Sequence, residues 1–146
     1  YRTQAVQTRL YNNKISRLRA AGYSRESAVE EAGRWVAVPG TSEHQTGLAL
    51  DIVSTGYQVL NKKQADTPEQ KWLMEHCWEY GFILRYPSDK SEITGISYEP
   101  WHYRYVGKEA ALAMRDSGQC LEEYLEALEE DAGQTGTSRT SPASIA

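Results

Sequence analysis

Two short segments of the 146-residue chain hold the residues best suited to metal chemistry. Residues 42–51 read SEHQTGLALD and contain His44 and Asp51, and residues 98–102 read YEPWH and contain His102. A catalytic zinc site needs three nitrogen or oxygen ligands and one open position for water. His44, Asp51 and His102 are therefore candidate ligands of one metal ion. The third histidine, His76, falls inside a predicted helix, and we expect it at the surface.

Glu99 is the candidate catalytic base. It precedes Pro100, which disfavours a helix at the residue before it and so favours an extended or bent chain. A bend here would direct Glu99 at a water molecule and His102 at the metal. Zinc lowers the pKa of a bound water, so that Glu99 could take its proton and pass a proton to the departing amine of a peptide.

The spacing between His44 and Asp51 requires a turn. Seven extended residues span more than about 20 Å, so the two side chains can share a metal only if the chain reverses, for which Gly47 gives freedom. Asp51 lies in an apolar segment, where an unpaired carboxylate is costly and either a metal ion or a buried arginine would compensate it. From these residues alone, a zinc site and two ordinary structural histidines both remain open.

The pattern S-x-H-x-x-G-x-A-x-D followed by E-P-W-H resembles the signature of the metallopeptidases that include the VanY-type D-alanyl-D-alanine carboxypeptidases. These enzymes share a fold with the VanX dipeptidases and the hedgehog amino-terminal domain. The resemblance covers roughly residues 1–130 and extends well beyond the candidate ligands, to residues 1–2, 35–45, 81–83, 85–87, 92–95, 103–107 and 120–125. No departure is seen at the matched ligand or base positions.

The resemblance implies a role for each matched residue. His44, Asp51 and His102 would bind Zn²⁺ and Glu99 would be the base. By the same resemblance, Arg2 would stabilise the developing oxyanion, and Ser42 and Gln7 would bind substrate. Each of these last three also has a plain interpretation: an exposed terminal residue for Arg2, a loop hydroxyl for Ser42 and a solvated helical residue for Gln7. Arg85 and Tyr86 would border the groove without a chemical role.

The implied activity is a D,D-carboxypeptidase that removes the terminal D-alanine from peptidoglycan stem peptides, linked to glycopeptide (vancomycin) resistance or cell-wall remodelling. An L,D-carboxypeptidase or a cell-wall endopeptidase with the same metal site is the alternative. A zinc-stabilised binding module, as the hedgehog relatives suggest, belongs to another class. Glu99 separates this last class from the enzymes, because a purely structural site needs no carboxylate at an open coordination position.

The elements that must position these residues are short. Helices are predicted over residues 3–21, 24–35, 68–80, 108–117 and 121–130, strands over 48–53, 82–85 and 101–106, and loops over 36–46 and 86–95. Helices interspersed with short strands favour a single α+β domain, with a small antiparallel sheet flanked by helices. We expect this catalytic domain over residues 1–131, cut short at its start, and a flexible tail over 132–146.

Charge and hydrophobicity limit the kinds of partner that this chain can bind. The net charge of −4 with mixed signs argues against nucleic acid, and no apolar run is long enough for a membrane helix. Cys77 and Cys120 could pair or could both be buried thiols. The resemblance to the VanY-type enzymes implies action at the bacterial cell surface. We expect a monomer, with any anchor or export signal upstream of Tyr1.

Overall fold

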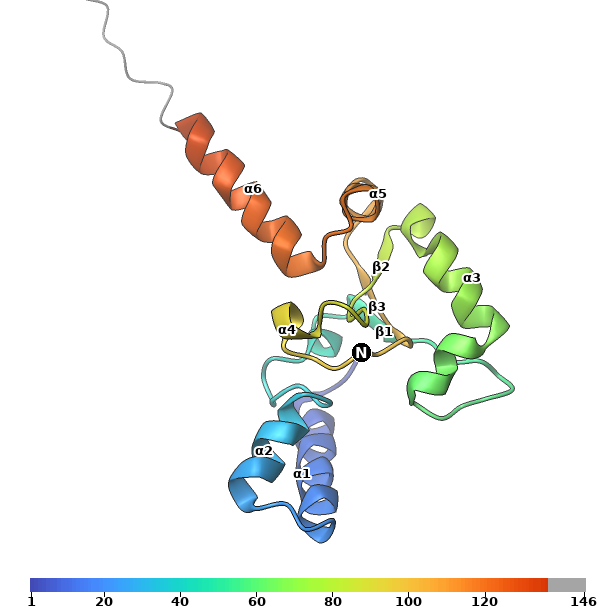
Figure 1. Ribbon diagram of the computed structural model, residues 1–146, viewed down its shortest axis with the longest axis vertical. Helices are drawn as coiled ribbons and strands as arrows, with labels where there is room; N and C mark the ends of the chain where they lie inside the picture. The colour runs from blue at the N-terminus through green and yellow to red at the C-terminus, as the bar shows by residue number, and fades with distance from the viewer. Residues whose placement is uncertain (137–146) are drawn as a thin grey trace, which may run out of the picture.

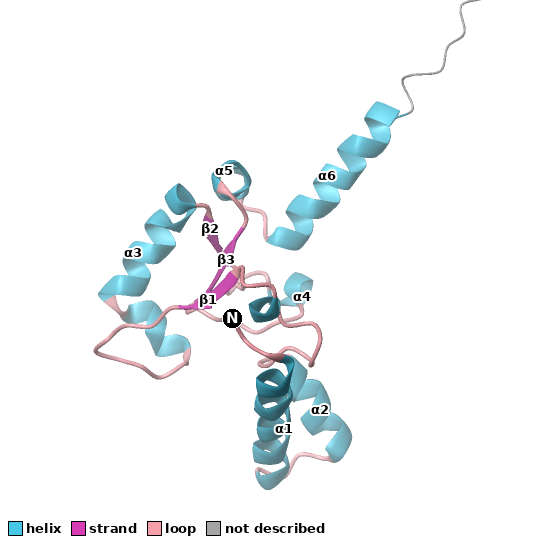
Figure 2. Cartoon of the chain, turned by 180° about the vertical axis from the view of Figure 1, so that it is seen from behind, coloured by secondary structure: helices cyan, strands magenta, loops and turns pink. Residues whose placement is uncertain are grey.

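The computed structural model describes residues 1–136 (Figure 1). A small sheet of three strands lies at the centre, and helices surround it on several sides (Figure 2). The predicted α+β class with a small antiparallel sheet is confirmed. In chain order the elements are α1 (Gln4–Ala20), α2 (Arg25–Gly33), the 3₁₀ helix η1 (Glu43–Gln45), β1 (Ala49–Asp51), η2 (Lys62–Asp66), α3 (Pro68–His76), η3 (Cys77–Tyr80), β2 (Phe82–Leu84), α4 (Ser91–Thr94), β3 (His102–Tyr105), α5 (Lys108–Ser117) and α6 (Leu121–Gly136).

The sheet has the order β1-β3-β2, and both pairings are antiparallel. In the β1–β3 register Asp51 faces His102, and Leu50 faces Tyr103. Side chains of residues directly opposite each other in an antiparallel pair lie on the same face, with Cβ atoms about 5 Å apart. The register therefore brings together two of the three predicted ligands, Asp51 and His102, which are 51 residues apart in the sequence.

Helices α1 and α2 form a hairpin below the sheet in Figure 1. Thr3 caps α1 by accepting a hydrogen bond from the backbone N–H of Val6, and Ser24 caps α2 in the same way by accepting from Ser27 N. Ala28 and Ala32 of α2 are completely buried, which is consistent with close packing of small residues. The N-terminal segment then reaches η1, where Arg2 N donates to the carbonyl of His44 (3.0 Å).

Buried glutamines fix the chain that follows β1. The Gln70 side-chain amide donates to Ile52 O and accepts a hydrogen bond from the Tyr103 hydroxyl (2.9 Å). Gln64 donates to Tyr57 O (2.5 Å) and accepts from Ser54 N (3.3 Å). Both glutamines are fully buried, and buried amides stabilise a structure only when they are paired in this way.

Several element boundaries differ from the prediction. The helix expected over residues 68–80 is α3 followed by η3, the predicted loops contain η1 and α4, and α2 ends at Gly33 instead of residue 35. The observed strands are three or four residues long, shorter than predicted. Each strand pairing contains only three residue pairs, and the chain beyond them continues as loop. Helix α6 continues to Gly136, beyond the expected domain end at residue 131, and positions 137–146 of the predicted tail lie outside the described residues.

Gly81 connects η3 to β2, and a side chain there would disturb the sheet. Its φ is +81°, and a Cβ atom would lie 3.1 Å from the backbone of Gly107 and Lys108 and 2.8 Å from the Tyr105 ring. We expect Gly81→Ala to lower the free energy of unfolding by about 2–4 kcal/mol, from the left-handed backbone and the overpacking together. The measurement is urea denaturation.

Gly118→Ala is the matched control. Gly118 also has a positive φ (+68°) but an added Cβ would meet nothing within 4 Å. We expect Gly118→Ala to lower the free energy of unfolding by only about 1 kcal/mol, which is the cost of the left-handed backbone alone. Equal losses for the two variants would show that close packing at Gly81 contributes nothing.

Candidate metal centre and active site

The three predicted ligands converge on one point. Their ligand atoms all lie within 4.8 Å of one another, with His44 Nε2 at 3.2 Å and His102 Nδ1 at 3.5 Å from Asp51 Oδ1. Donor atoms bound about 2.1 Å from a tetrahedral zinc ion would lie roughly 3.4 Å apart. The spacing therefore fits a single bound ion.

Local structure explains the convergence. His44 lies in η1, and the chain reverses after it at Gly47, whose φ of +79° is the turn that the spacing required. The reversed chain enters β1, which carries Asp51 into the pairing with His102. Both histidines are buried, with 7% and 5% of their surfaces exposed.

The two oxygens of Asp51 have different partners. Oδ2 accepts a hydrogen bond from Arg2 (2.9 Å), whereas Oδ1 is buried and accepts none from any of residues 1–136. A metal ion and a buried arginine were the two ways to compensate this carboxylate, and the structure provides the arginine at one oxygen and a metal-like donor cluster at the other. A buried carboxylate oxygen with no hydrogen-bond donor, flanked by two imidazoles, is a donor set that suits a metal ion.

The electrostatics of the cluster favour an added cation. Burial raises the pKa of the Glu99 carboxyl above its usual range, because His102 only partly offsets the lost hydration. Burial alone would lower the pKa of His102, but the carboxylates of Glu43, Glu99 and Asp51 outweigh it and raise that pKa. The pKa of Asp51 is lowered, since His44, His102 and Arg2 together overcome the effect of burial. The carboxylates of Glu43, Asp51 and Glu99 thus favour a positive charge at or near His102, as a bound metal ion would supply.

Glu99 reaches the cluster through a tight turn. The backbone N–H of His102 donates to Glu99 O (3.1 Å), with Pro100 following Glu99 as it commonly does at the second position of such turns. The predicted bend is present, and it brings Glu99 Oε2 to 3.5 Å from His102 Nδ1. Glu99 is 7% exposed and lines the same cavity as the three candidate ligands.

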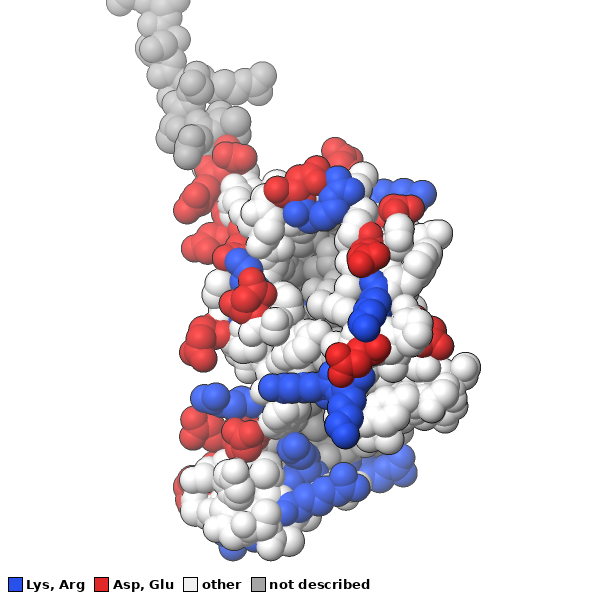
Figure 3. Space-filling model, turned by 45° about the vertical axis from the view of Figure 1, so that its right-hand side comes forward, with Lys and Arg blue, Asp and Glu red and all other residues white. Residues whose placement is uncertain are grey.

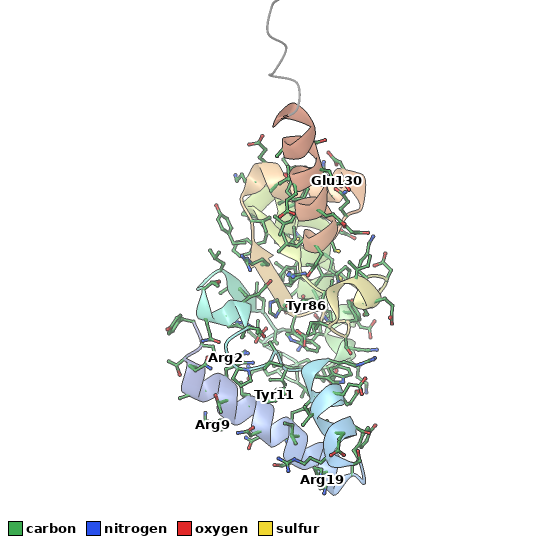
Figure 4. All side chains as sticks on the ribbon, turned by 90° about the vertical axis from the view of Figure 1, so that its left-hand side faces the viewer. Arg2, Arg9, Tyr11, Arg19, Tyr86 and Glu130 are labelled. Atoms are coloured by element: carbon green, nitrogen blue, oxygen red, sulfur yellow. The ribbon has the colours of Figure 1, made fainter. Side chains whose placement is uncertain are left out.

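Arg2 and Ser42 also line this cavity, whose volume is about 320 Å³. Arg2 comes from the segment before α1 (Figure 4). The Tyr86 ring packs against the His102 ring, with the centroids 4.8 Å apart. The hydroxyl of the buried Ser42 does not cap η1, which leaves it available to a ligand in the cavity. Its expected contact with substrate stays a prediction.

Gln7 lies behind Arg2, outside the cavity wall. It is completely buried, accepts a hydrogen bond from Arg2 NH1 (3.1 Å) and donates to Ala37 O (2.6 Å). The interpretation of Gln7 as a solvated helical residue is therefore wrong. In this structure its amide holds the guanidinium in place, and direct contact of Gln7 with substrate stays a prediction.

Glu43 is not among the predicted site residues, and Arg85 has no predicted chemical role. Glu43 Oε1 accepts hydrogen bonds from Arg85 (2.7 Å) and pairs with Arg104 (3.1 Å), while Oε2 lies 3.5 Å from His102 Nε2. These contacts overcome burial and lower the pKa of Glu43 to about 2. Arg85 in turn donates to both oxygens of Glu122 on α6 (2.9 and 2.5 Å). A carboxylate beside the far nitrogen of a ligating histidine fixes the orientation of its ring.

The remaining predicted candidates lie elsewhere. His76 is at the end of α3, partly exposed, with Nδ1 2.7 Å from Glu79 Oε1. Cys77 and Cys120 are buried free thiols, and burial raises the pKa of Cys77 to about 11. The alternative of a disulfide between them is not found in this structure.

Fold and site together define a class of protein. A small antiparallel sheet presents two imidazoles and a carboxylate around one point, with a buried glutamate beside them, as in hydrolytic metal centres. The family model described as VanY: D-alanyl-D-alanine carboxypeptidase matches residues 1–108. The chain belongs to this family.

Individual relatives agree. A D-alanyl-D-alanine carboxypeptidase of Enterococcus faecalis (strain ATCC 700802 / V583) is 50% identical over 125 residues, covering 86% of this chain and 45% of the relative. The chain thus spans less than half of that protein. A structure of VanYB in complex with D-alanine-D-alanine is 50% identical with a TM-score of 0.78, covering 86% of this chain and 67% of that one.

Two further solved structures bear on metal and specificity. A VanY D,D-pentapeptidase variant in complex with Zn(II) is 50% identical with a TM-score of 0.76, covering 86% of this chain and 67% of that one. The structure of the LD-carboxypeptidase LdcB is 43% identical with a TM-score of 0.72, and the match covers 86% of this chain and 55% of that one. The family's fold therefore accommodates both D,D- and L,D-specific enzymes.

Glu43→Gln tests whether Glu43 positions the His102 ring. We expect zinc affinity to fall by about 10- to 100-fold, because the amide removes the charge facing Nε2 while keeping the side chain's size. Competition with a chromophoric chelator at neutral pH measures this. The exposed Glu75→Gln is the matched control and should bind zinc like the parent protein. If Glu43→Gln bound zinc as tightly as the parent protein, Glu43 would not position His102 and would serve only to pair with Arg85 and Arg104.

Proposed function

We propose that this protein is a zinc-dependent D,D-carboxypeptidase that hydrolyses the terminal D-Ala–D-Ala bond of peptidoglycan stem peptides. One observation carries the proposal: His44, Asp51 and His102 gather around one point, and the buried carboxylate of Glu99 lies beside them. Membership of the VanY family and the likeness to VanYB in complex with D-alanine-D-alanine support the choice of substrate.

His44 Nε2, Asp51 Oδ1 and His102 Nδ1 would hold the zinc ion. Zinc, when bound, would polarise the scissile carbonyl and lower the pKa of a water molecule. Glu99 is placed to accept a proton from that water and to deliver a proton to the leaving amino group. Its burial keeps bulk solvent from competing for the carboxylate.

Arg2 would stabilise the negative charge that develops on the carbonyl oxygen. Its guanidinium uses one N–H on Asp51 and one on Gln7, which leaves three of its five donors for a ligand in the cavity. These two bonds hold the group in a fixed orientation, and such preorganisation is what makes a charge effective in catalysis. Ser42 would hydrogen-bond the substrate from the same wall, and Gln7 would support Arg2.

Three alternatives compete with this assignment. The 43% identity to the LD-carboxypeptidase LdcB supports L,D specificity on the same metal site, and a cell-wall endopeptidase would share it too. A non-catalytic binding module is less well supported, since Glu99 is buried beside the ligands without a structural ion pair of its own to an arginine or lysine in residues 1–136.

The setting of this activity is part of the proposal. Peptidoglycan lies outside the cytoplasm, so we place the protein at the bacterial cell surface, acting as a monomer in glycopeptide resistance or in wall remodelling. Of the helices in residues 1–136, none is both long and apolar enough to cross a bilayer.

Defined stem peptides decide between the two carboxypeptidase activities. We expect the protein to release D-alanine from a pentapeptide ending in D-Ala-D-Ala and to leave the tetrapeptide ending in a single D-Ala intact. Mass spectrometry of the products is the measurement. Release of alanine from the tetrapeptide alone would replace the proposal with the L,D alternative, and internal cleavage of cross-linked peptides would replace it with an endopeptidase.

Glu99→Gln separates catalysis from metal binding. We expect turnover of the pentapeptide to fall by at least about 100-fold, the usual contribution of a general base, while zinc remains bound at one ion per chain by elemental analysis. Chelation should inactivate the parent protein and added zinc should restore it. The exposed Glu126→Gln is the control and should keep parent activity. Undiminished turnover in Glu99→Gln would remove Glu99 from the mechanism.

A further inference from the structure

The cavity of the metal centre continues along α1 to a positively charged end. Beyond the ligands and Arg2, its walls include Asn13, Lys14 and Arg17 from α1 and Trp35 from the segment after α2. We call these four residues the cationic end of the cavity. Figure 3 shows Lys and Arg side chains gathered on this part of the molecule, at the end formed by α1 and α2.

One face of α1 forms this wall. Leu10, Asn13, Lys14 and Arg17 line the cavity and follow the three- and four-residue spacing of a single helical face. Gln7, which holds Arg2 at the metal end, lies on the same face. At 1.5 Å per residue, Lys14 and Arg17 are displaced from Gln7 by about 10 and 15 Å along the helix axis.

The charges at this end have no partner of opposite sign within residues 1–136. Lys14 Nζ lies 4.9 Å from the centroid of the Trp35 ring, and neither Lys14 nor Arg17 forms an ion pair. Glu31, a carboxylate close to Trp35, accepts a hydrogen bond from Trp35 Nε1 (2.8 Å). Helix α1 itself contains no acidic residue in its seventeen positions, in a chain whose net charge is −4.

The length of the cavity decides which part of a substrate reaches this end. On the leaving side of the scissile bond, a carboxypeptidase accommodates one residue only. The residues that precede the scissile bond must then lie in the part of the cavity that runs along α1 to the cationic end. An extended peptide advances about 3.3 Å per residue, so 10–15 Å corresponds to roughly three or four residues.

We propose that the cationic end binds a carboxylate on the third or fourth residue before the scissile bond, so that the enzyme prefers anionic peptides. This inference rests on the proposed function. Lys14 and Arg17 supply the charge, Asn13 supplies a hydrogen bond, and Trp35 packs against the peptide chain. The site selects a class of peptide by charge, independently of the residues that perform the hydrolysis.

Paired peptides test the proposal. Each peptide ends in D-Ala-D-Ala and carries either glutamate or its neutral isostere glutamine at the third or at the fourth residue before the scissile bond. For the parent protein we expect kcat/KM to be about tenfold higher for the better glutamate peptide than for its glutamine partner, as for partly exposed charge pairs acting together. The ratio should shrink with added salt.

The double variant Lys14→Gln/Arg17→Gln should lower that ratio to about one, chiefly by lowering kcat/KM for the glutamate peptide. Arg9→Gln is the matched control, because Arg9 is an exposed cation of α1 that does not line the cavity (Figure 4). It should keep the full preference. Equal cleavage of both peptides by the parent protein, or a preference that survives in the double variant, would overturn the proposal.

Binding measurements keep this test separate from the proposed function. Cleavage of none of the peptides would reject the D,D-carboxypeptidase activity and leave the cationic end to be judged by calorimetry on the same peptides with Glu99→Gln. Tighter binding of the glutamate peptide, lost in Lys14→Gln/Arg17→Gln on that background, would support the site. Equal affinities for the two peptides would reject it.

Discussion

The pairing of Asp51 with His102 across two short antiparallel strands is the constraint on which the site depends. A slip of one residue would turn every side chain of β1 to the opposite face and separate the ligands. The strands are only three and four residues long, so their few ladder bonds do little to fix the register by themselves. The fully buried Tyr103, next to His102 and bonded to Gln70, anchors β3 in place. A hydrogen bond in the core thus helps set the geometry of the metal centre.

Charge compensation organises the surroundings of the ligands. Burying a carboxylate is costly unless it is paired. Arg2 pairs with one oxygen of Asp51, and Arg85 and Arg104 pair with Glu43, whereas Glu99 lies beside the imidazole of His102. The Arg85 contact to Glu122 extends this arrangement to α6, which lies beyond the residues that the family model matches. The C-terminal helix is therefore electrostatically connected to the centre, although it projects away from the sheet (Figure 1).

The division of the molecule into a sheet and a helical hairpin creates the cavity between them. The sheet and its turns carry the ligands and Glu99, whereas α1 contributes the wall that leads away from them. Arg2 joins the two parts, because its backbone bonds to His44 and its side chain bonds to both Asp51 and Gln7. The sheet and its turns therefore carry the residues for hydrolysis, whereas α1 carries the residues that we propose to bind the more distant part of the substrate.

The sequence by itself determined the features that depend on local chemistry. The two histidine motifs, the bend at Pro100, the turn at Gly47 and the cap at Ser24 follow from side-chain types and backbone preferences within a few residues. Resemblance to a known family added the roles that such spacing leaves open. Tertiary structure alone decided that Gln7 is buried behind Arg2, that the thiols stay apart, and that Glu43 bonds Arg85 and faces His102. These contacts join residues that lie far apart along the chain, where no local preference selects one oppositely charged or polar partner over another.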